Sequence, residues 1–216
     1  MRFVLASGNA HKLIEFRGIL APHEVMPMPA GVILPEEGTE SFAENARGKA
    51  LALARALRAA EPSDDGGTVA GAGERPWCIA DDSGLEVEAL GWAPGVISAR
   101  YASVDGPGAD AANVARLLRE LAGLAGPLAR RARFVCSLCA VAPDGTEHAV
   151  EGRWWGAIAD SPRGYGGFGY DPVFVPDGSE LTVAEWPATE KDKASHRARA
   201  GLALLEMLRR EAVPGA

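Results

Sequence analysis

The chain has 216 residues, of which 47% are hydrophobic and 24% charged, so it is long enough for one ordinary soluble domain or one domain with a small lobe. Its formal charge of −7 argues against a protein that coats nucleic acids, and it has no apolar run of the ~18–20 residues that span a membrane. The apolar stretch after Arg2 is too short for the core of a signal peptide, so we expect a cytoplasmic protein.

A short strand followed by a helix is predicted at the N-terminus. Residues 2–6 are apolar, and residues 10–20 have the apolar period of a helix. The residues expected to face inward are Leu13, Phe16, Ile19 and Leu20. The joint is a small polar turn, Ser7-Gly8-Asn9, and Lys12 lies in the first helical turn, where a cation opposes the helix dipole. An anion bound between unpaired backbone amides of the turn and the Lys12 ammonium would explain this position; an ordinary strand–helix joint is the alternative.

The second predicted helix begins at a capping signal. Ser41 and Glu44 have the S-x-x-E spacing of a capping box, which predicts a helix from Ser41 to about Ala60. Residues 61–76 follow as a polar, glycine-rich loop without periodicity, which we interpret as a flexible insertion with no chemical role. The apolar residues 77–80 then predict a short strand.

Two pairs of adjacent carboxylates flank this helix in the sequence. Asp81 and Asp82 follow the predicted strand, where a carboxylate near a core needs water, a cation or hydrogen-bond donors. The alternatives are an Asx-type turn that ends the strand at Gly84 and a ligand site into which one of the two aspartates points. Glu36 and Glu37 precede a glycine turn, which is usually solvated surface. One of them together with Asp82 would suit Mg²⁺, which takes one or two protein carboxylates.

A helix and a hairpin are predicted in the middle of the chain. The helix spans residues 109–122, with an apolar face of Val114, Leu117, Leu118 and Leu121. Strands over residues 132–142 and 146–158, joined by a Pro-Asp-Gly turn, read as a hairpin. Cys136 and Cys139 lie on the first of these strands, where positions three apart point to opposite faces. We therefore interpret them as buried apolar residues and not as a metal or redox pair.

The segment GYGGFGYDP, residues 164–172, is dense in glycine and aromatic residues. Its glycines allow the backbone to approach a flat ligand, and Phe168 and Tyr170 offer ring faces for stacking. The alternative is a hairpin loop whose aromatic side chains pack inward. A strand is predicted directly after it, within PVFVP.

The last predicted helix carries a cluster of cations. It runs from near Lys193 to about Glu211, with Ala194, Ala198, Leu202, Leu205 and Leu208 inward. Five basic or titratable residues occur within nine positions: Lys191, Lys193, His196, Arg197 and Arg199. Lys193, His196 and Arg197 would share one helix face. A solvated surface would account for them, but with the carboxylates and the glycine-rich loop they indicate a site for an anionic, flat, metal-bearing ligand such as a nucleoside triphosphate.

Strands and helices intermix along the chain, which predicts a mixed α/β fold. Four segments in order also resemble the inosine/xanthosine triphosphate pyrophosphatase family, whose members remove non-canonical purine nucleotides. The segments are SGNAHKLIEF, ADDSGLEVEALGWAPGVISARYA, GGFGYDP and EKDKASHR. The resemblance extends from Arg2 to about Leu208 and leaves out residues 61–76.

The resemblance implies an enzyme that needs Mg²⁺ and hydrolyses ITP, dITP and XTP between the α and β phosphates. It implies an α/β fold with an elongated mixed β-sheet flanked by helices, two lobes and a central active-site cleft, in one domain over residues 1–216. It also implies a homodimer. The apolar residues after Gly91 are candidates for core or interface: Trp92, Val96, Ile97 and Tyr101. Two other functions stay open: a nucleotide pyrophosphatase with a preference for pyrimidine or modified bases, and a nucleotide sensor that does not cleave its ligand.

The expected site residues come from the same resemblance. Asp82 matches the general base that also touches the metal, and Ser83 matches its substrate-binding neighbour. Glu36 is the expected second metal carboxylate, with Glu37 as its competitor. At His11 many relatives have Gly. The other expected substrate contacts are Ser7, Gly8, Asn9, Ala10, His11 and Lys12 around the triphosphate, Phe168, Gly169, Tyr170 and Asp171 at the base, and Lys191, His196 and Arg197.

Overall fold

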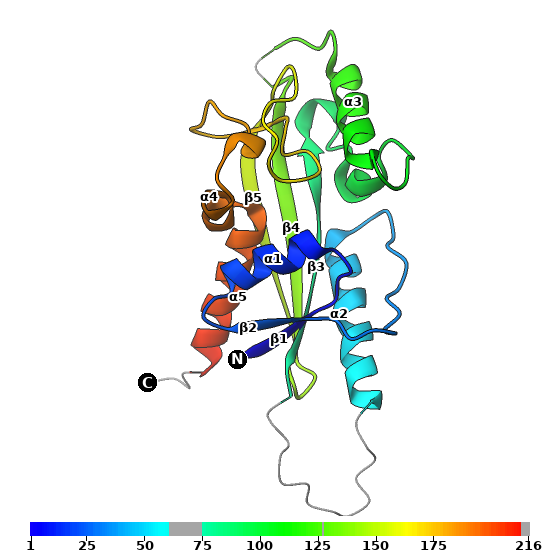
Figure 1. Ribbon diagram of the computed structural model, residues 1–216, viewed down its shortest axis with the longest axis vertical. Coiled ribbons are helices and arrows are strands. Elements are labelled where there is room, and N and C mark those ends of the chain that lie inside the picture. Colours follow the sequence, from blue (N-terminus) through cyan, green and yellow to red (C-terminus); the bar gives the residue numbers. More distant parts are fainter. Residues whose placement is uncertain (61–74, 127, 213–216) are drawn as a thin grey trace, which may run out of the picture. The chain divides into compact units, whose positions relative to one another are not determined.

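The computed structural model describes residues 1–60, 75–126 and 128–212, so all but the last two residues of the predicted insertion lie outside the described residues. The strands form a six-stranded sheet in the order β2-β1-β3-β4-β5-β6, and Figure 1 shows it with its helices. The strands are β1 Arg2–Leu5, β2 Glu24–Pro27, β3 Trp77–Val87, β4 Arg131–Val141, β5 Glu147–Ile158 and β6 Phe174–Pro176.

Helices flank this sheet, which confirms the predicted mixed α/β class. The α-helices are α1 Ala10–Ile19, α2 Phe42–Ala59, α3 Ala109–Leu121, α4 Ala188–Ala194 and α5 His196–Ala212. Short 3₁₀ helices occur at Glu88–Leu90, Gly95–Arg100 and Val183–Glu185. Within the part of the chain that the structure describes, no helix has both the length and the apolar character needed to cross a membrane.

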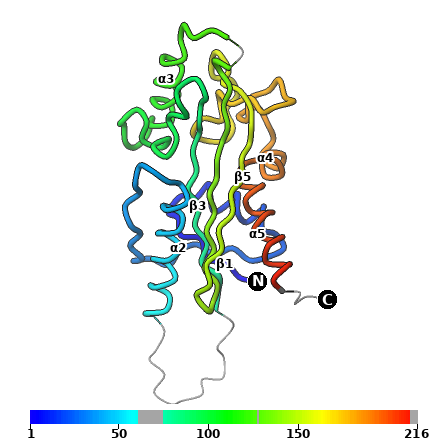
Figure 2. The backbone as a smooth tube through the Cα atoms, turned by 180° about the vertical axis from the view of Figure 1, so that it is seen from behind, coloured from blue at the N-terminus to red at the C-terminus, as the bar shows by residue number. Residues whose placement is uncertain are grey.

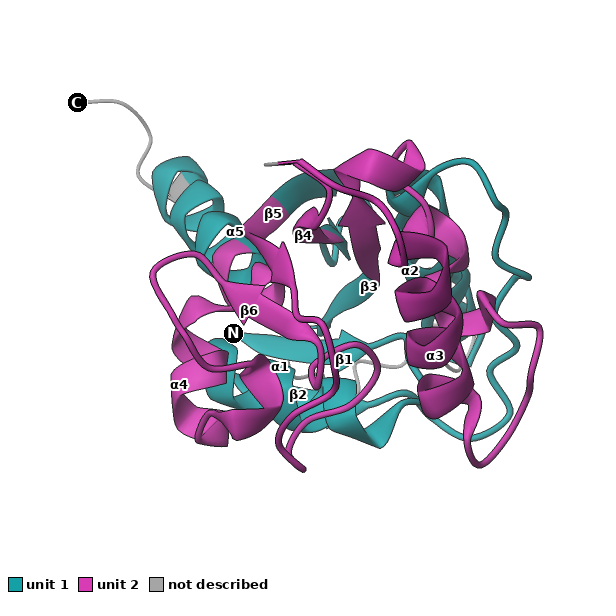
Figure 3. Cartoon of the chain, turned by 90° about the horizontal axis from the view of Figure 1, so that it is seen from above, with its two compact units in different colours: residues 1–82, 137–151, 200–216 teal, residues 83–136, 152–199 magenta. Residues whose placement is uncertain are grey.

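The chain divides into two compact units, which Figure 3 colours separately. The first unit comprises residues 1–82, 137–151 and 200–216. Within it, β1 pairs in parallel with both β2 and β3. The strands of this unit lie between α2 and the part of α5 from residue 200 onward, as Figures 1 and 2 show from opposite sides. Its buried core consists of Val4, Ala6, Ala46, Ala50, Leu53, Ala54, Cys78, Ala80, Cys139 and Val141.

The second unit comprises residues 83–136 and 152–199. Within it, β5 pairs antiparallel with β6, and α3 packs its apolar face inward. Its buried core consists of Leu85, Val87, Tyr101, Val114, Leu117, Leu121, Ala132, Phe134, Trp154, Ile158, Tyr170, Val173, Phe174 and Val183. Tyr101 is thus a core residue, and the partly buried Ile97 packs against the same cluster.

Most locally encoded elements are confirmed. Ser41 is the N-cap of α2, and its side chain accepts a hydrogen bond from the Glu44 backbone amide at 3.2 Å. The hairpin of β4 and β5 closes at the predicted turn, where the Ala142 amide donates to the Thr146 carbonyl at 2.8 Å. Helices α1 and α3 begin and end within a residue of their predicted bounds, with the expected apolar faces inward.

The strand predicted over residues 77–80 is too short. β3 continues through the polar run Asp81-Asp82-Ser83-Gly84 and ends at Val87, so the Asx-turn alternative is wrong. The edge strand β2 was not predicted at all. It has four residues and ends at Pro27, whose missing backbone donor is tolerated at a sheet edge.

The single C-terminal helix predicted from Lys193 is wrong, because Ser195 divides the segment into α4 and α5. The Ser195 backbone is extended, and its hydroxyl accepts a hydrogen bond from the Ala198 amide at 3.1 Å, as an N-cap does. Lys193 therefore does not share a helix face with His196 and Arg197.

One position in the predicted apolar stripe of α5 also differs. Leu202 is 56% exposed, whereas Leu204 is fully buried. The inward face instead follows Ala198, Gly201, Leu204, Leu205 and Leu208, which recur at the three- and four-residue spacings of a helix.

Two helical glycines give opposite expectations for stability. A Cβ at Gly48 in α2 would lie in ordinary contact, 3.5 Å from Pro35 Cγ, so we expect Gly48→Ala to stabilise the protein by ~0.5–1 kcal/mol. A Cβ at Gly201 in α5 would lie 2.4 Å from Ile19 Cγ2, so Gly201→Ala should destabilise by ~1–3 kcal/mol. Urea unfolding of both variants measures the two changes in the free energy of unfolding. Changes of the same sign would contradict the expectation.

Candidate functional site

Two buried aspartates lie in the middle of β3. Asp81 and Asp82 are only 1% and 5% exposed, and they point to opposite faces because side chains alternate along a strand. Each meets a different lysine of the first unit: Lys12 Nζ lies 2.9 Å from Asp81 Oδ1, and Lys49 Nζ lies 3.7 Å from Asp82 Oδ1. The polar run can therefore continue the strand, because each carboxylate has a cation to balance its burial.

Asp82 belongs to a group of polar side chains around α2. The Asn45 amide donates to Asp82 Oδ2 at 2.9 Å, and Lys49 Nζ donates to Glu37 Oε1 at 2.7 Å. Asn45 also holds the acidic turn, since its side-chain oxygen accepts a hydrogen bond from the Gly38 amide at 2.8 Å. Glu37, Lys49 and Asp82 thus form one chain of charges.

Burial and charge act in opposite directions on this group. Burial raises the pKa of Asp82 above its ordinary value, while the Lys49 ammonium and the Asn45 amide oppose that rise. Burial lowers the pKa of Lys49, but the carboxylates of Asp82 and Glu37 outweigh it, so the pKa ends above its ordinary value. Lys49 is therefore a permanent cation beside Asp82 at neutral pH.

Lys49 and Asn45 are functional candidates that the sequence reading missed. Both lie on the buried face of α2, among Phe42, Ala46, Ala50, Leu53 and Ala54. A lysine and an asparagine at helical spacing within an apolar face were visible in the sequence, and such side chains need partners when buried. That pattern was the available signal.

Lys12 is placed where an aspartate balances it. Its ammonium is largely buried against Asp81, whose side chain is fully buried. This ion pair explains the cation in the first turn of α1 by a contact within the chain, in addition to any anion that it binds.

The expectation of unpaired amides in the turn at residues 7–12 is wrong for four of them. The Ser7 amide donates to the Leu5 carbonyl at 2.9 Å. The Asn9 amide donates to Ser7 Oγ at 3.1 Å, and the His11 and Lys12 amides donate to Asn9 Oδ1 at 2.9 and 3.3 Å. Asn9 is the N-cap of α1, and N-cap side chains satisfy these amides. An incoming anion would have to compete with the Leu5, Ser7 and Asn9 oxygens for them.

The acidic turn presents Glu37, and not Glu36, to Lys49 and Asp82. Glu36 and Glu37 are both exposed residues of this turn, and it is Glu37 that shares the Lys49 ammonium with Asp82. Two carboxylates around one cationic group fit Mg²⁺, which takes one or two protein carboxylates and leaves other positions to water and phosphate. In the described ranges no three His, Cys, Asp or Glu side chains gather into a metal site of their own. The residues present thus fit a metal that completes its coordination with substrate.

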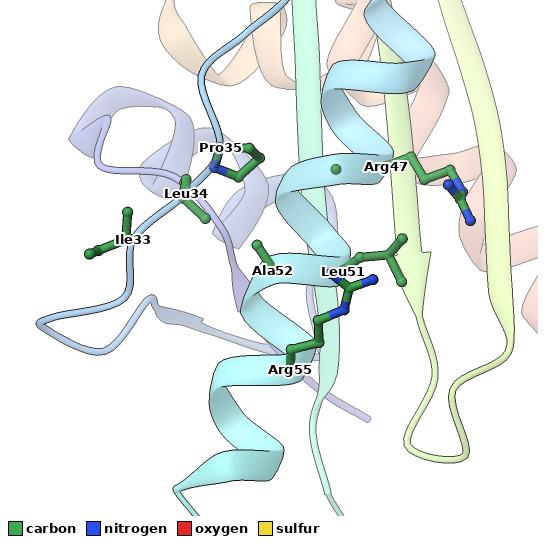
Figure 4. A pocket seen from close by; sticks show the side chains of 8 residues that line it. Ile33, Leu34, Pro35, Arg47, Leu51, Ala52 and Arg55 are labelled. Atoms are coloured by element: carbon green, nitrogen blue, oxygen red, sulfur yellow. The ribbon is translucent and has the colours of Figure 1, made fainter.

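A separate cavity lies between α2 and the loop before it. It has a volume of about 520 Å³ and is lined by Ile33, Leu34, Pro35, Arg47, Gly48, Leu51, Ala52 and Arg55. Figure 4 shows Arg47 directed away from Ile33, and its guanidinium donates to both carboxylate oxygens of Glu147 at 2.6 and 2.9 Å. None of the predicted site residues lines this cavity, so it is no part of the candidate site.

In the second unit, a buried ion pair fixes the glycine-rich loop. Lys191 Nζ donates to Asp171 Oδ2 at 2.7 Å, and both side chains are nearly inaccessible to solvent. The same carboxylate oxygen accepts the Phe168 amide at 2.9 Å. Gly167 has a φ of 71°, and a Cβ there would lie 2.0 Å from Asp171 Oδ2, so only glycine fits at this position.

The two loop aromatics have different surroundings. Phe168 is half-buried, with Lys191 Nζ 4.5 Å and Arg197 Cζ 5.3 Å from its ring centroid. Tyr170 is buried and its hydroxyl donates to the Ser98 carbonyl at 2.9 Å; burial also raises its pKa. The inward-packing alternative is therefore correct for Tyr170, which offers no free ring face, whereas Phe168 lies among cations.

The start of α5 brings two predicted residues, His196 and Arg197, into contact with the core of this unit and with Ser83 on β3. The Arg197 guanidinium donates to Ser83 Oγ at 2.8 Å, and Arg197 is 5% exposed. The His196 ring is buried and stacks on Phe134. Lys193, by contrast, has a side chain that is 71% exposed and pairs with Glu190, so it lies on the solvated surface.

The cysteines have the properties expected of apolar core residues. Cys78, Cys136 and Cys139 are buried and reduced. Burial raises the pKa of Cys78 and of Cys139 to about 11, so both are neutral thiols near pH 7.

Comparisons with known proteins identify the family of this chain. The sequence profile of the Ham1 family matches residues 3–207. A dITP/XTP pyrophosphatase of Parasynechococcus marenigrum is 45% identical over 206 residues, which cover 94% of this chain and 92% of that protein. A dITP/XTP pyrophosphatase of Mycobacteroides abscessus is 43% identical over 218 residues, which cover 97% and 95%. The solved structure of the Staphylococcus aureus Ham1 protein has a TM-score of 0.76 and 34% identity, over 98% of this chain and 100% of that one. The chain belongs to the Ham1 family.

Proposed function

We propose that this chain hydrolyses non-canonical purine nucleoside triphosphates, namely ITP, dITP and XTP, to the monophosphate and pyrophosphate. Full-length similarity to proteins named dITP/XTP pyrophosphatase supports the proposal. The observation that carries it is Asp82: a buried carboxylate, raised in pKa, which Asn45 orients and beside which Lys49 lies. A protein that only bound nucleotides would have no use for such a group.

We assign one set of residues to the phosphates and to the attack of water. Asp82 orients a water molecule and accepts its proton as the water attacks the α-phosphorus, and the bond from that phosphorus to the departing pyrophosphate breaks. Lys12 and the polar turn at residues 7–12 balance the charge on the leaving group. Lys49 favours the charged form of Asp82, because its ammonium opposes the rise in pKa that burial causes.

A divalent metal, for which we propose Mg²⁺, belongs to the same set of residues. Asp82 and Glu37 would hold it, in place of the predicted pair Asp82 and Glu36. When bound, it supplies positive charge to the phosphate oxygens. The two carboxylates provide part of its coordination and leave positions for substrate oxygens.

We assign a second set of residues to the base. Hypoxanthine and xanthine present a 6-oxo acceptor and an N1–H donor, whereas adenine presents the reverse pair. In our proposal, His196 and Arg197 donate hydrogen bonds to the 6-oxo group, and Phe168 stacks on the base. A site that pairs with the 6-oxo and N1–H groups leaves buried polar groups unpaired when adenine binds. Such a mismatch lowers kcat/KM for the adenine nucleotide by ~10⁴-fold relative to the 6-oxo purine nucleotide. Guanine shares the 6-oxo edge, so GTP must be rejected at its 2-amino group.

A substrate panel tests the proposal. Pyrophosphate release from ITP, XTP, dITP, GTP and ATP at equal concentration, with Mg²⁺ and with a chelator, should favour the first three and require metal. Orthophosphate as product, or equal cleavage of ATP, would contradict it. Preference for a pyrimidine or methylated nucleotide would favour the altered-base enzyme, and Mg–ITP binding without turnover would favour a sensor.

The two glutamates of the acidic turn give a matched pair of variants. We expect Glu37→Gln to lower kcat by roughly 10–100-fold and to raise the Mg²⁺ concentration for half-maximal rate, because Glu37 shares a cation with Asp82. Glu36→Gln removes the adjacent exposed charge and should stay within about twofold. Titration of the rate with Mg²⁺ measures both, and the reverse order would restore Glu36 as the metal carboxylate.

The expected homodimer and cytoplasmic location stay predictions for this chain. Sedimentation at micromolar concentration decides the first. A monomer with full activity would show that each chain carries a complete site.

A further inference from the structure

His196 begins α5, and the helix alone does not fix the plane of its ring. It follows the extended residue Ser195, whose side chain caps the helix. Rotation about the last side-chain bond of a histidine has broad, shallow preferences, so neighbouring groups must set the ring orientation. A hydrogen-bond donor is directional, and a tilted ring aims its N–H away from the acceptor.

Phe134 provides a flat surface against that ring. The two ring centroids lie 4.8 Å apart with an angle of 13° between the planes, which is a parallel stack. His196 is 3% exposed, so no solvent layer competes with this contact. Phe134 lies on β4, and its position is fixed by the backbone of the sheet.

Phe134 also contacts a second ring. Phe174 on β6 meets it at a centroid distance of 4.6 Å and an angle of 58°, and Trp154 meets Phe174 at 5.6 Å and 58°. Phe174 is fully buried and Phe134 is 7% exposed. The three rings belong to one buried cluster, and Phe134 is the member that stacks on His196.

We propose that Phe134 is a positioning residue for base selectivity: it sets the plane of the His196 ring and so aims its donor at the 6-oxo group. The proposal rests on the function proposed above. Next to His196, the Arg197 guanidinium donates a hydrogen bond to Ser83 Oγ at 2.8 Å, and the His196 ring stacks on Phe134. Removal of the Phe134 ring should therefore misdirect the His196 donor while it lowers the free energy of unfolding only modestly.

Phe134→Leu tests the proposal, with Phe174→Leu as the matched control. Both remove one buried ring of the same cluster, but only the first removes the surface under His196. We expect Phe134→Leu to lower kcat/KM for ITP by about tenfold or more and to narrow the ITP-to-ATP ratio. Phe174→Leu should change the ITP-to-ATP ratio of kcat/KM much less. Phe134→Tyr keeps a flat ring against His196, so its ratio should stay close to that of the wild type. Should Phe134→Leu not fold, Phe134→Met removes the same surface.

An NMR measurement separates this proposal from the proposed function. The chain has four histidines, so histidine-labelled protein gives four ring signals, and His196→Gln assigns one of them. A stacked ring shields the His196 protons, and Phe134→Leu should move their signal downfield while Phe174→Leu leaves it nearly in place. An unmoved signal, or equal effects of both variants on selectivity, would overturn the positioning role. If the wild type did not prefer ITP, the function and the selectivity role would fail together, and the signal would show whether the stack alone exists.

Discussion

Asp82→Asn should lower pyrophosphate release from ITP by roughly 10²–10⁴-fold, the usual worth of a positioned general base. Asparagine keeps the shape of the side chain but cannot accept a proton from water or carry charge to a metal. Asp82 is 5% exposed and 3.7 Å from Lys49, so the substitution also leaves that ammonium with one carboxylate fewer. Initial rates under saturating ITP and Mg²⁺ measure the loss.

Asp160→Asn is the control for this experiment. Asp160 has a side chain that is 88% exposed and pairs with Arg130 on the surface, so its rate should stay within about twofold of wild type. Thermal melts of both variants exclude unfolding as the cause of a lower rate. If Asp82→Asn kept more than a tenth of the wild-type rate with its fold intact, another group would have to be the base.

The second large effect is expected on stability, from Lys191→Met. This change leaves the Asp171 carboxylate, 2% exposed, without the ammonium that lies 2.7 Å away. Removal of one partner from a buried ion pair costs about 3–5 kcal/mol, because the remaining charge is uncompensated. Urea unfolding measures the change, and weaker ITP binding should accompany it because Asp171 also holds the Phe168 amide.

Two further variants make this prediction specific. Lys193→Met removes a neighbouring lysine whose side chain is 71% exposed, and it should change stability by less than about 0.5 kcal/mol. The double variant Lys191→Met with Asp171→Asn removes both charges and should recover most of the lost stability. A double variant as unstable as Lys191→Met alone would show that packing, and not the orphaned charge, causes the loss.

Elements specified by local pattern could be predicted from the sequence, and elements specified by distant contacts could not. Helix α2 begins at a capping residue that lies next to it in the chain, and the hairpin turn carries its own Pro-Asp-Gly signal. The extension of β3 through Asp81 and Asp82 depends on lysines from two different helices, α1 and α2. No periodicity within residues 77–87 indicates those partners. The division at Ser195 likewise depends on its capping bond to α5, within a segment whose pattern permits one continuous helix.

The same distinction applies to the candidate site. Resemblance identified a set of polar residues, but it could not say which neighbours hold them. The choice between Glu36 and Glu37 depends on how the turn bends toward Lys49, and adjacent positions in a sequence give no information about that. The partners Asn45 and Lys49 were missed because the apolar residues around them on α2 indicate a core-facing helix and do not indicate a polar site.

The alternation of Asp81 and Asp82 has a consequence for chain length in β3. A strand shifted by one residue presents every side chain to the opposite face. Deletion of one residue before Asp81 would bring Asp82 to the position that faces Lys12 and Ser83 to the position that faces Lys49. An insertion would bring Asp81 to the position that faces Lys49, although all the charged residues would still be present. Natural variation within β3 should therefore be by substitution only, with changes of length confined to the segments outside it. In this strand, the number of residues before Asp81 is therefore as important as their identity.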